Sequence, residues 1–548
     1  MTAAAGVPDV LPRLAPAASS APVAARPAAP AAPAAAQGEH FDKRKLAAFI
    51  FMVFGMFMAI LDIQIVSASI SEIQAGLSAS QDEVTWVQTA YLVAEVIMIP
   101  LSGFLSRVLS TRIIFTISAA GFTLMSLMCS TATTIDQMIV WRALQGFIGG
   151  GMIPTVFASA YTIFPRSKQP IIGPVIGLVA TLAPTIGPTV GGYLTDWFSW
   201  HWLFLVNIPP GIIVTIAAWT LIDFDKSDFS LVKRFDWTGL AAMAAFLGAL
   251  EYALEEGPSK DWLESQPVAF AIIVSALGAV VFFWRAFTAH QPIVDLTTFR
   301  DRNFWAGSLM SFVMGVGLYG LTYVYPVYLS AVRGYTPLMI GETMFVTGIC
   351  MFLTAPISGR LSTTVDPRFM IATGFVGFSI GTYIAARITP DWDFYELLVP
   401  QIFRGVSLML CMVPINNVAL GTMSPQKIKN ASGMFNLTRN LGGAVGLALI
   451  NTVLDKRLDL HLQRLRESIV WGREIADSTM ASLTAGFASR GSDAGLAATK
   501  QLGLMVRRQA LVMSLADVFM ALTALFFLAA ALAMLMKRPQ MAGGGGGH

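Results

Sequence analysis

Fourteen apolar segments, each long enough to cross a lipid bilayer as a helix, constrain this sequence more than any other feature. A helix needs about 20 predominantly apolar residues to span the hydrocarbon core. Only 13% of the residues are charged, against about 25% in soluble proteins. We therefore expect an all-α integral membrane protein with spans at 46–70, 84–105, 112–131, 136–160, 170–194, 202–222, 237–254, 267–287, 304–330, 338–359, 369–387, 394–420, 432–453 and 510–536.

The basic residues between the segments support this number of spans. Short cytoplasmic connections collect Lys and Arg. With a cytoplasmic N-terminus, the inner side holds nineteen basic residues and the short outer connections hold three, Lys260, Arg333 and Arg387. Losing one span would invert every later connection. Both termini are therefore predicted to be cytoplasmic.

One long connection, 454–509, departs from this charge rule, since it carries nine basic residues on the predicted outer side. Long segments translocate regardless of charge. Its pattern LDKRLDLHLQRLRESIVWGREI is amphipathic, which predicts a periplasmic connection with helical structure. The Ala/Pro-rich residues 1–42 and the Gly-rich residues 538–548 are predicted to be flexible tails.

Ionisable residues inside membrane spans are costly unless they are paired or face water, so each one is a candidate functional residue. Each could equally be a structural residue that satisfies a backbone or hydroxyl partner. The candidates in the body of the spans are Asp62, Glu95, Arg142, Glu251, Arg404 and Arg439, while Glu342 and Asp517 lie near span ends.

Several function classes are disfavoured by what the sequence lacks. The glycine runs GFIGGG and GPTVGG lie within apolar spans, so they predict close helix packing rather than a dinucleotide site. No nucleotide-binding G-x-x-x-x-G-K-[ST] motif occurs, and a net charge of +3 gives no reason to expect a nucleic-acid partner. The five histidines and three cysteines show no ligand spacing, so neither a metal nor an organic cofactor is expected.

A short internal repeat predicts a duplicated architecture. The segment LSGFLSRVLSTR at 101–112 resembles ISGRLSTTVDPR at 357–368, each directly after an apolar span and on the predicted cytoplasmic side. Many secondary transporters consist of two such repeated bundles.

Five motifs in order resemble the fourteen-span drug/proton antiporter family of the major facilitator superfamily, the EmrB/FarB/QacA-like multidrug exporters. They are LDIQIVSASI at 61–70, TWVQTAYLVAEVIMIPLSGFL at 85–105, RALQGFIGGG at 142–151, APTIGPTVGG at 183–192 and WHWLFLVNIPPG at 200–211. The resemblance covers 46–540 and implies the major facilitator fold, with two six-helix bundles and two inserted linker helices.

The resemblance implies domains at 43–222 (first bundle), 223–302 (linker helices) and 303–537 (second bundle, with the long connection). It implies proton coupling at Asp62, Glu95 and Arg142, with Gln145 and Gly146 in the fourth-helix motif. The fifth-helix antiporter motif would be a bent, smooth-faced helix against the other bundle, formed by Pro184, Gly187, Pro188, Gly191 and Gly192. Glu251, Arg404 and Arg439 are further candidates for a substrate or linker site.

The loop motif after the second span departs from the family pattern. Gly103 and Leu105 are present, but Arg107 occupies the acidic position and Ser110 the second glycine. The acid that joins the two halves elsewhere in the family is therefore missing from this motif.

The implied function is export of amphiphilic drugs driven by the proton gradient, with the substrate near the bilayer midplane. The resemblance implies a place in the inner membrane of a bacterium, with a periplasmic adaptor and an outer-membrane channel as protein partners. The other implied partners are lipid, protons and a small amphiphile. Export of a fatty acid or of a specific endogenous metabolite remains an alternative, and a membrane receptor or enzyme a remote one. The resemblance is to transporters, so no catalytic residues are expected.

Overall fold

A computed structural model describes residues 43–164, 169–421, 423–424, 427–469, 473–488 and 493–536. The helix bundle lies in the unit Arg44–His548. Among the described residues all regular structure is helical, and no strand occurs. The predicted all-α fold is confirmed, while the two predicted tails lie outside the described residues.

The first half consists of α1 to α9. Their bounds are α1 Lys43–Ala68, α2 Ile70–Leu77, α3 Gln81–Leu109, α4 Thr111–Ser130, α5 Ile135–Gly149, α6 Met152–Ile163, α7 Gln169–Trp197, α8 Trp202–Leu205 and α9 Ile208–Leu221. Local sequence sets several of these starts. Ser80 and Glu83 form a capping box at α3, and the Thr134 side chain accepts a hydrogen bond from the Gln137 amide at α5.

The linker and the second half follow in the order that the apolar segments predict. The linker comprises η1 Phe229–Arg234, α10 Trp237–Glu256, η2 Trp262–Glu264, α11 Gln266–Thr288 and η3 Leu296–Arg300. The second half comprises α12 Arg302–Ala331, α13 Pro337–Thr364, α14 Pro367–Ala385, α15 Phe394–Leu420, α16 Ile428–Ser468, α17 Glu474–Phe487 and α18 Ala494–Leu535.

Twelve helices of the described residues are long and apolar enough to cross a membrane, and the bent helix α7 brings the number to thirteen. The remaining predicted span, 432–453, lies inside α16. That helix does not meet the same apolar criterion. Its start is rich in Asn, Ser and Gly and it contains Arg439, and many of these residues are buried against other helices.

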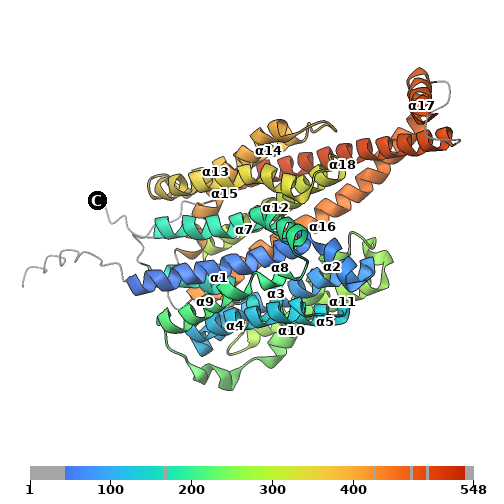
Figure 1. Cartoon of the computed structure of the whole chain (residues 1–548). Coiled ribbons are helices and arrows are strands. Elements are labelled where there is room, and N and C mark those ends of the chain that lie inside the picture. Colours follow the sequence, from blue (N-terminus) through green and yellow to red (C-terminus); the bar gives the residue numbers. More distant parts are fainter. Residues whose placement is uncertain are drawn as a thin grey trace, which may run out of the picture. The chain divides into compact units, whose positions relative to one another are not determined.

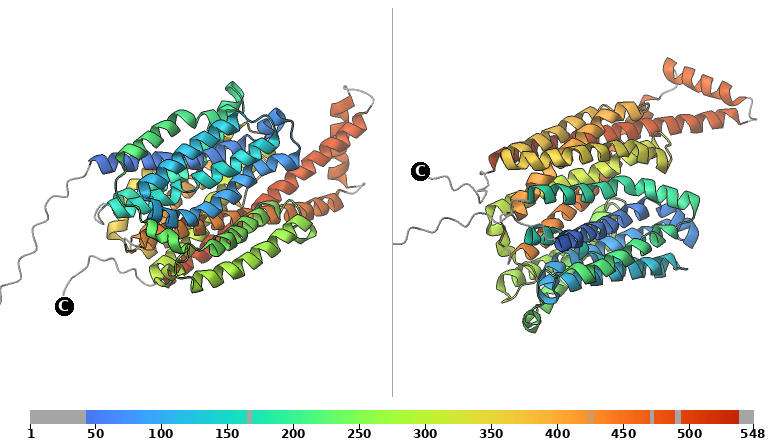
Figure 2. Two further views of the ribbon diagram at one scale, coloured as in Figure 1. Left: turned by 90° about the horizontal axis from the view of Figure 1, so that it is seen from below. Right: turned by 60° about the vertical axis from the view of Figure 1, so that its left-hand side comes forward.

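Several helix pairs connect the halves directly. α7 packs against α13 and α15, and α3 packs against α16. The linker helices α10 and α11 lie side by side (Figure 2), and α10 also packs against both α3 and α16. The linker therefore lies against the contact between the two halves, which brings its residue Glu251 close to α3 and α12.

The segment 454–509 is mainly a continuation of two spans. α16 runs on to Ser468 and α18 begins at Ala494, with α17 between them. Figure 1 shows α17 at the far ends of these two helices. His461 of α16 lies 2.9 Å from the carboxylate of Asp517 in α18, which joins the two long helices where they leave the bundle. The predicted helical structure is present. The stretch between the end of α16 and the start of α18 is much shorter than the predicted connection 454–509.

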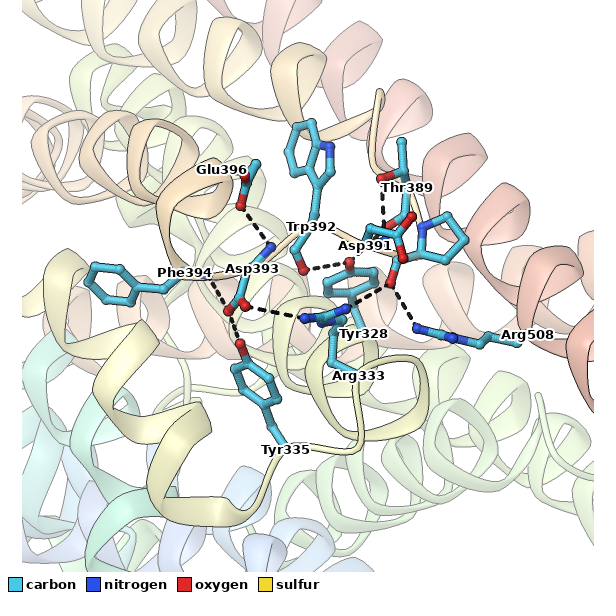
Figure 3. Close-up of polar contacts among 11 residues, drawn as sticks. Tyr328, Arg333, Tyr335, Thr389, Asp391, Trp392, Asp393, Phe394, Glu396 and Arg508 are labelled. Atoms are coloured by element: carbon cyan, nitrogen blue, oxygen red, sulfur yellow. Dashed lines mark hydrogen bonds and ion pairs between the residues drawn. The ribbon is translucent and has the colours of Figure 1, made fainter.

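A polar cluster holds α18 to the ends of its neighbours (Figure 3). The Tyr328 hydroxyl donates to the carbonyl oxygens of Thr389 and Trp392, at 2.7 and 3.0 Å. Arg508 of α18 donates to the Pro390 carbonyl oxygen at 2.9 Å. Asp393 starts α15 with a capping box and also binds Arg333 at 3.2 Å. Arg508, which lies well inside α18, thus ties this helix to the turn between α14 and α15.

A charged contact joins the halves at the turn between α3 and α4, although Arg107 occupies the acidic position of the loop motif. Asp225, which follows α9, accepts hydrogen bonds from the Thr111 amide and hydroxyl at 3.0 Å. It also pairs with Lys429 of α16, which donates to the Ser106 carbonyl oxygen at 2.9 Å. Asp225 therefore supplies, from a different place in the sequence, the acid that the loop motif lacks.

Gly103 of the same motif explains how α16 comes so close. A Cβ atom added at Gly103 would lie 2.9 Å from the Lys429 carbonyl oxygen, so only glycine fits here. The glycine that the motif retains positions the lysine for the ion pair.

We expect Asp225→Asn and Lys429→Met each to lower the melting temperature of the purified protein, because both side chains are mostly buried in this contact. Breaking such a pair leaves one charge uncompensated and costs about 1–3 kcal/mol. The exchange Asp225→Lys with Lys429→Asp should recover part of this loss. Asp223→Asn, at an exposed neighbour, is the control. Equal melting temperatures for all variants would show that the pair does not stabilise this arrangement.

Candidate functional site

The centre of the first half contains a buried ion pair. Arg142 of α5 donates from Nη1 to Oδ2 of Asp62 in α1 at 2.6 Å, and both side chains are fully buried. Gln145, one turn further along α5, accepts from the same Nη1 at 2.8 Å and lies 3.4 Å from Asp62 Oδ1. The predicted residues Asp62, Arg142 and Gln145 therefore form one network.

Further polar groups complete the coordination of Asp62. Asn207 donates from Nδ2 to Asp62 Oδ1 at 2.7 Å and to the Ser126 hydroxyl at 3.2 Å. Ser126 of α4 in turn donates to the Phe204 carbonyl oxygen at 2.9 Å. Asn207 and Ser126 are not among the candidates predicted from sequence, because they are neutral and those candidates were chosen for their charge. The position of Asn207 just before α9, within the motif at 200–211, was the available signal.

Helix α3 covers the other face of Arg142. The guanidinium lies 4.2 Å from the ring centroid of Tyr91, and its Nε donates to the Val87 carbonyl oxygen at 3.2 Å. A Cβ atom added at Gly146 would clash with the Tyr91 carbonyl oxygen. The glycine of the fourth-helix motif therefore lets α5 approach α3 closely enough for these contacts.

Glu95 lies one turn beyond Tyr91 on α3, and its environment differs from that of Asp62. Its side chain is 4% exposed. A Cβ atom at Gly150 would lie 3.1 Å from Glu95 Cγ, so the break between α5 and α6 faces this carboxyl group. Within the described part of the chain, Glu95 has no hydrogen bond or ion pair, although it is in electrostatic range of Arg142 and Asp62. Asp62 is a paired acid and Glu95 an unpaired one.

Glu251 lies in electrostatic range of this unpaired acid, and Arg439 lies in range of the neighbouring Tyr319. Glu251 of α10 is 7% exposed and in electrostatic range of Glu95. Arg439 of α16 stacks on Phe157 at 5.0 Å and binds Asn436. Tyr319 of α12 lies in electrostatic range of Glu95, Glu251 and Arg439. Residues of the linker and of both halves are therefore in electrostatic range of Tyr319.

Arg404 of α15 has a different set of neighbours. Its Nη2 donates to the Thr322 hydroxyl at 2.5 Å, and its Nη1 lies 3.5 Å from Gln401 Oε1. The ring of Tyr325 is 5.9 Å away. Of the three further candidates, Glu251 and Arg439 are both in electrostatic range of Tyr319, while Arg404 has separate neighbours.

The fifth-helix motif lies in α7, which is bent by 42° between Ile172–Pro184 and Ile186–Trp197. Pro188 lacks the amide that would bind the Pro184 carbonyl oxygen, which accounts for a bend here. The predicted bent helix against α13 and α15 is present.

The glycines of this motif face a different neighbour from the one expected. Added Cβ atoms at Gly187 and Gly191 would meet Gln64 and Ile65 of α1, in the same half. The contact with α13 is made by Thr189, against Gly341. The expectation that Gly187 and Gly191 form the smooth face toward the other half is therefore wrong, and their close packing fixes α7 to α1. Gly192 is buried beside them.

No group of three or more His, Cys, Asp or Glu side chains with the geometry of a metal site occurs in the described ranges. Cys129, Cys350 and Cys411 are free thiols. Cys129 instead donates weakly to Gln145 at 3.7 Å, so it belongs to the packing around the ion pair.

Comparison with known proteins gives these residues a context. The family model described as Major Facilitator Superfamily matches residues 52–447. The colistin resistance protein EmrB of Acinetobacter baumannii is 42% identical over 90% of this chain and 97% of its own length. The fatty acid resistance protein FarB of Neisseria gonorrhoeae is 29% identical over 90% and 96%, and the multidrug export protein EmrB of Escherichia coli is 28% identical over 90% and 95%.

Solved structures support the same fold. The human organic anion transporter MFSD10 matches with a TM-score of 0.57 at 11% identity, covering 89% of this chain and 99% of that one. A bacterial homologue of the lysosomal transporter Spinster matches with a TM-score of 0.53 at 14% identity, covering 91% and 99%. With a family match over most of its length and full-length relatives, this chain belongs to the major facilitator superfamily, among its EmrB-like exporters.

Proposed function

We propose that this protein exports amphiphilic compounds from the cytoplasm in exchange for protons, with Glu95 as the residue that binds and releases the proton. The single observation that carries the proposal is the contrast between two buried acids. Asp62 has Arg142, Asn207 and Gln145 as partners, whereas Glu95 has none within the described residues. An acid without a partner in a membrane interior is the one whose charge a proton or a cationic ligand must neutralise.

The place of Glu95 suits alternating access. It lies on α3, one of the helices that contact the other half through α16, and near Glu251 of the linker. A rocking motion of the halves would change the surroundings of this carboxyl group from one side of the membrane to the other. The ion pair of Asp62 and Arg142 would hold α1 to α5 within the first half, so that these two helices move together as one body.

The substrate class follows from the relatives and from the lining. The relatives are named for resistance to colistin and to fatty acids and for multidrug export. Around the charged residues lie Phe157, Tyr319 and other apolar side chains, whose surface accepts ligands of several shapes. We propose bulky amphiphiles as substrates.

The helical extension formed by 454–509 is the proposed docking surface for a periplasmic adaptor, which would connect the exporter to an outer-membrane channel. The extension leaves the bundle as two long helices with α17 between them (Figures 1 and 2). Exposed apolar residues Ile475, Leu496 and Leu504 lie on it. In this arrangement both termini of the chain are cytoplasmic.

The test is a transport assay in everted membrane vesicles whose interior has been made acidic. A fluorescent dye reports the gradient while tetraphenylphosphonium, weak acids and laurate are added one at a time. Release of the gradient by at least one compound, absent in vesicles without the protein, is the expected result. Folded protein that responds to no compound on the panel, with and without a co-expressed adaptor, would contradict proton-coupled export of amphiphiles.

A further inference from the structure

The two halves contain matching arginine–glutamine pairs. In α5, Arg142 Nη1 donates to Gln145 three residues later, at 2.8 Å, and in α15 Arg404 Nη1 lies 3.5 Å from Gln401 three residues earlier. A glycine that allows close packing belongs to each pair. Added Cβ atoms at Gly146 and Gly405 would meet backbone carbonyl oxygens of α3 and α13, respectively. The polar centre of the first half thus has a counterpart in the second.

The two centres differ in the group opposite the arginine. In the first half, Asp62 of α1 supplies a carboxylate at 2.6 Å from Arg142. In the second half, α12 supplies only the neutral hydroxyl of Thr322, at 2.5 Å from Arg404 Nη2. No Asp or Glu oxygen of the described residues lies within the 4.0 Å ion-pair distance of Arg404.

The guanidinium of Arg404 is also incompletely hydrogen-bonded. Its Nε has no partner in the described part of the chain, and the side chain is 2% exposed. The remaining neighbour of Nη1 is the Met344 sulfur at 3.8 Å, a weak acceptor. Arginine stays charged in proteins, and a buried charge without a counter-ion is costly. One bound anion would therefore neutralise the charge of Arg404.

We propose that Arg404 binds the carboxylate head of an anionic amphiphilic substrate, a step that rests on the proposed export function. The Nε–Nη2 edge of a guanidinium matches the two oxygens of a carboxylate. At Arg404 this edge carries the partnerless Nε and the Nη2 that holds only the Thr322 hydroxyl. Met344 and Tyr325 beside it supply the apolar surface that an acyl chain would contact.

Access to Arg404 would come from separation of the halves. α13 and α15, which hold Met344 and Arg404, are also the helices that pack against α7 of the first half. When the halves move apart, the layer between these helices is exposed to substrate. The proton and the anion would then be handled by different residues, the proton by Glu95 on α3 and the anion by Arg404 on α15.

The substitution Thr322→Asp tests the proposal, because it gives Arg404 an internal carboxylate as Asp62 does for Arg142. In the vesicle assay we expect the concentration of laurate needed for half-maximal release of the gradient to rise at least about tenfold. A rise of this size corresponds to the loss of one charged hydrogen bond. The response to tetraphenylphosphonium should be unchanged. Thr322→Asn introduces a side chain of the same size as aspartate but without its charge, and should keep the laurate response.

Purified protein provides a second readout. Laurate should raise the melting temperature of the wild type, its uncharged methyl ester should not, and laurate should lose this effect in Thr322→Asp and Arg404→Gln. If Thr322→Asp does not fold, Arg404→Gln and the conservative Arg404→Lys carry the test, with a partial laurate response expected for lysine.

Several results would overturn the inference. They are an unchanged laurate response in Thr322→Asp, a joint loss of the laurate and tetraphenylphosphonium responses in folded protein, and equal stabilisation by laurate and its methyl ester. Wild-type protein that responds to tetraphenylphosphonium but neither binds nor responds to laurate would reject the anion site and leave proton-coupled export intact. Failure of every wild-type response would reject the export function itself.

Discussion

Vesicles that carry the Glu95→Gln protein are expected to keep their proton gradient when substrate is added, whereas wild-type vesicles lose theirs. Glutamine has the size of a protonated glutamate but cannot release a proton. Since Glu95 is buried and has no partner in the described residues, the change breaks no hydrogen bond or ion pair there. The protein should therefore fold and bind substrate normally. The coupled rate should fall by about a hundredfold or more.

A second measurement separates loss of coupling from loss of binding. Exchange of labelled substrate across the membrane without a gradient requires alternating access but no net proton movement. Glu95→Gln should retain this exchange, and Asp82→Asn, at an exposed acid in the first turn of the same helix, should behave as wild type in both assays. A gradient released by Glu95→Gln as quickly as by wild type would exclude Glu95 as the proton carrier.

The sequence predicted the elements of the first-half site well. Asp62, Arg142 and Gln145 came from two motifs, and the structure joins all three. Charged residues inside apolar segments are rare, which makes them easy to find, and their burial forces them together. The order and limits of the helices followed from the same apolar lengths, with the helical extension of α16 and α18 as the main difference.

Contacts that depend on the register between distant helices could not be predicted in the same way. Lys429 finds Asp225, far away in the sequence, because Gly103 allows α16 to approach α3. Likewise, the direction in which Gly187 and Gly191 face depends on the rotation of α7 about its axis, and a glycine pattern does not contain that angle. Neutral partners such as Asn207 are hidden for a related reason, since nothing in their own chemistry marks them among many polar residues.

The structure also changes the expectation for Asp62, which the sequence grouped with Glu95 as a proton carrier. Its two carboxylate oxygens are occupied by Arg142, Asn207 and Gln145. Removing one partner of a buried ion pair leaves the other charge uncompensated, which costs about 3–5 kcal/mol. We therefore expect Asp62→Asn to lower the melting temperature of the purified protein strongly, with little folded protein recovered.

The double variant Asp62→Asn with Arg142→Gln distinguishes this structural role from a role in proton transfer. It replaces the two charged side chains by neutral amides, which can hydrogen-bond to each other and to Asn207. Replacing a whole buried pair is far less costly than removing one partner, so most of the lost stability should return. Asp136→Asn, at an exposed acid in the first turn of α5, should have no effect. If Asp62→Asn were instead as stable as wild type and lost only coupled export, Asp62 would be a proton carrier, and the ion pair would have to open during transport.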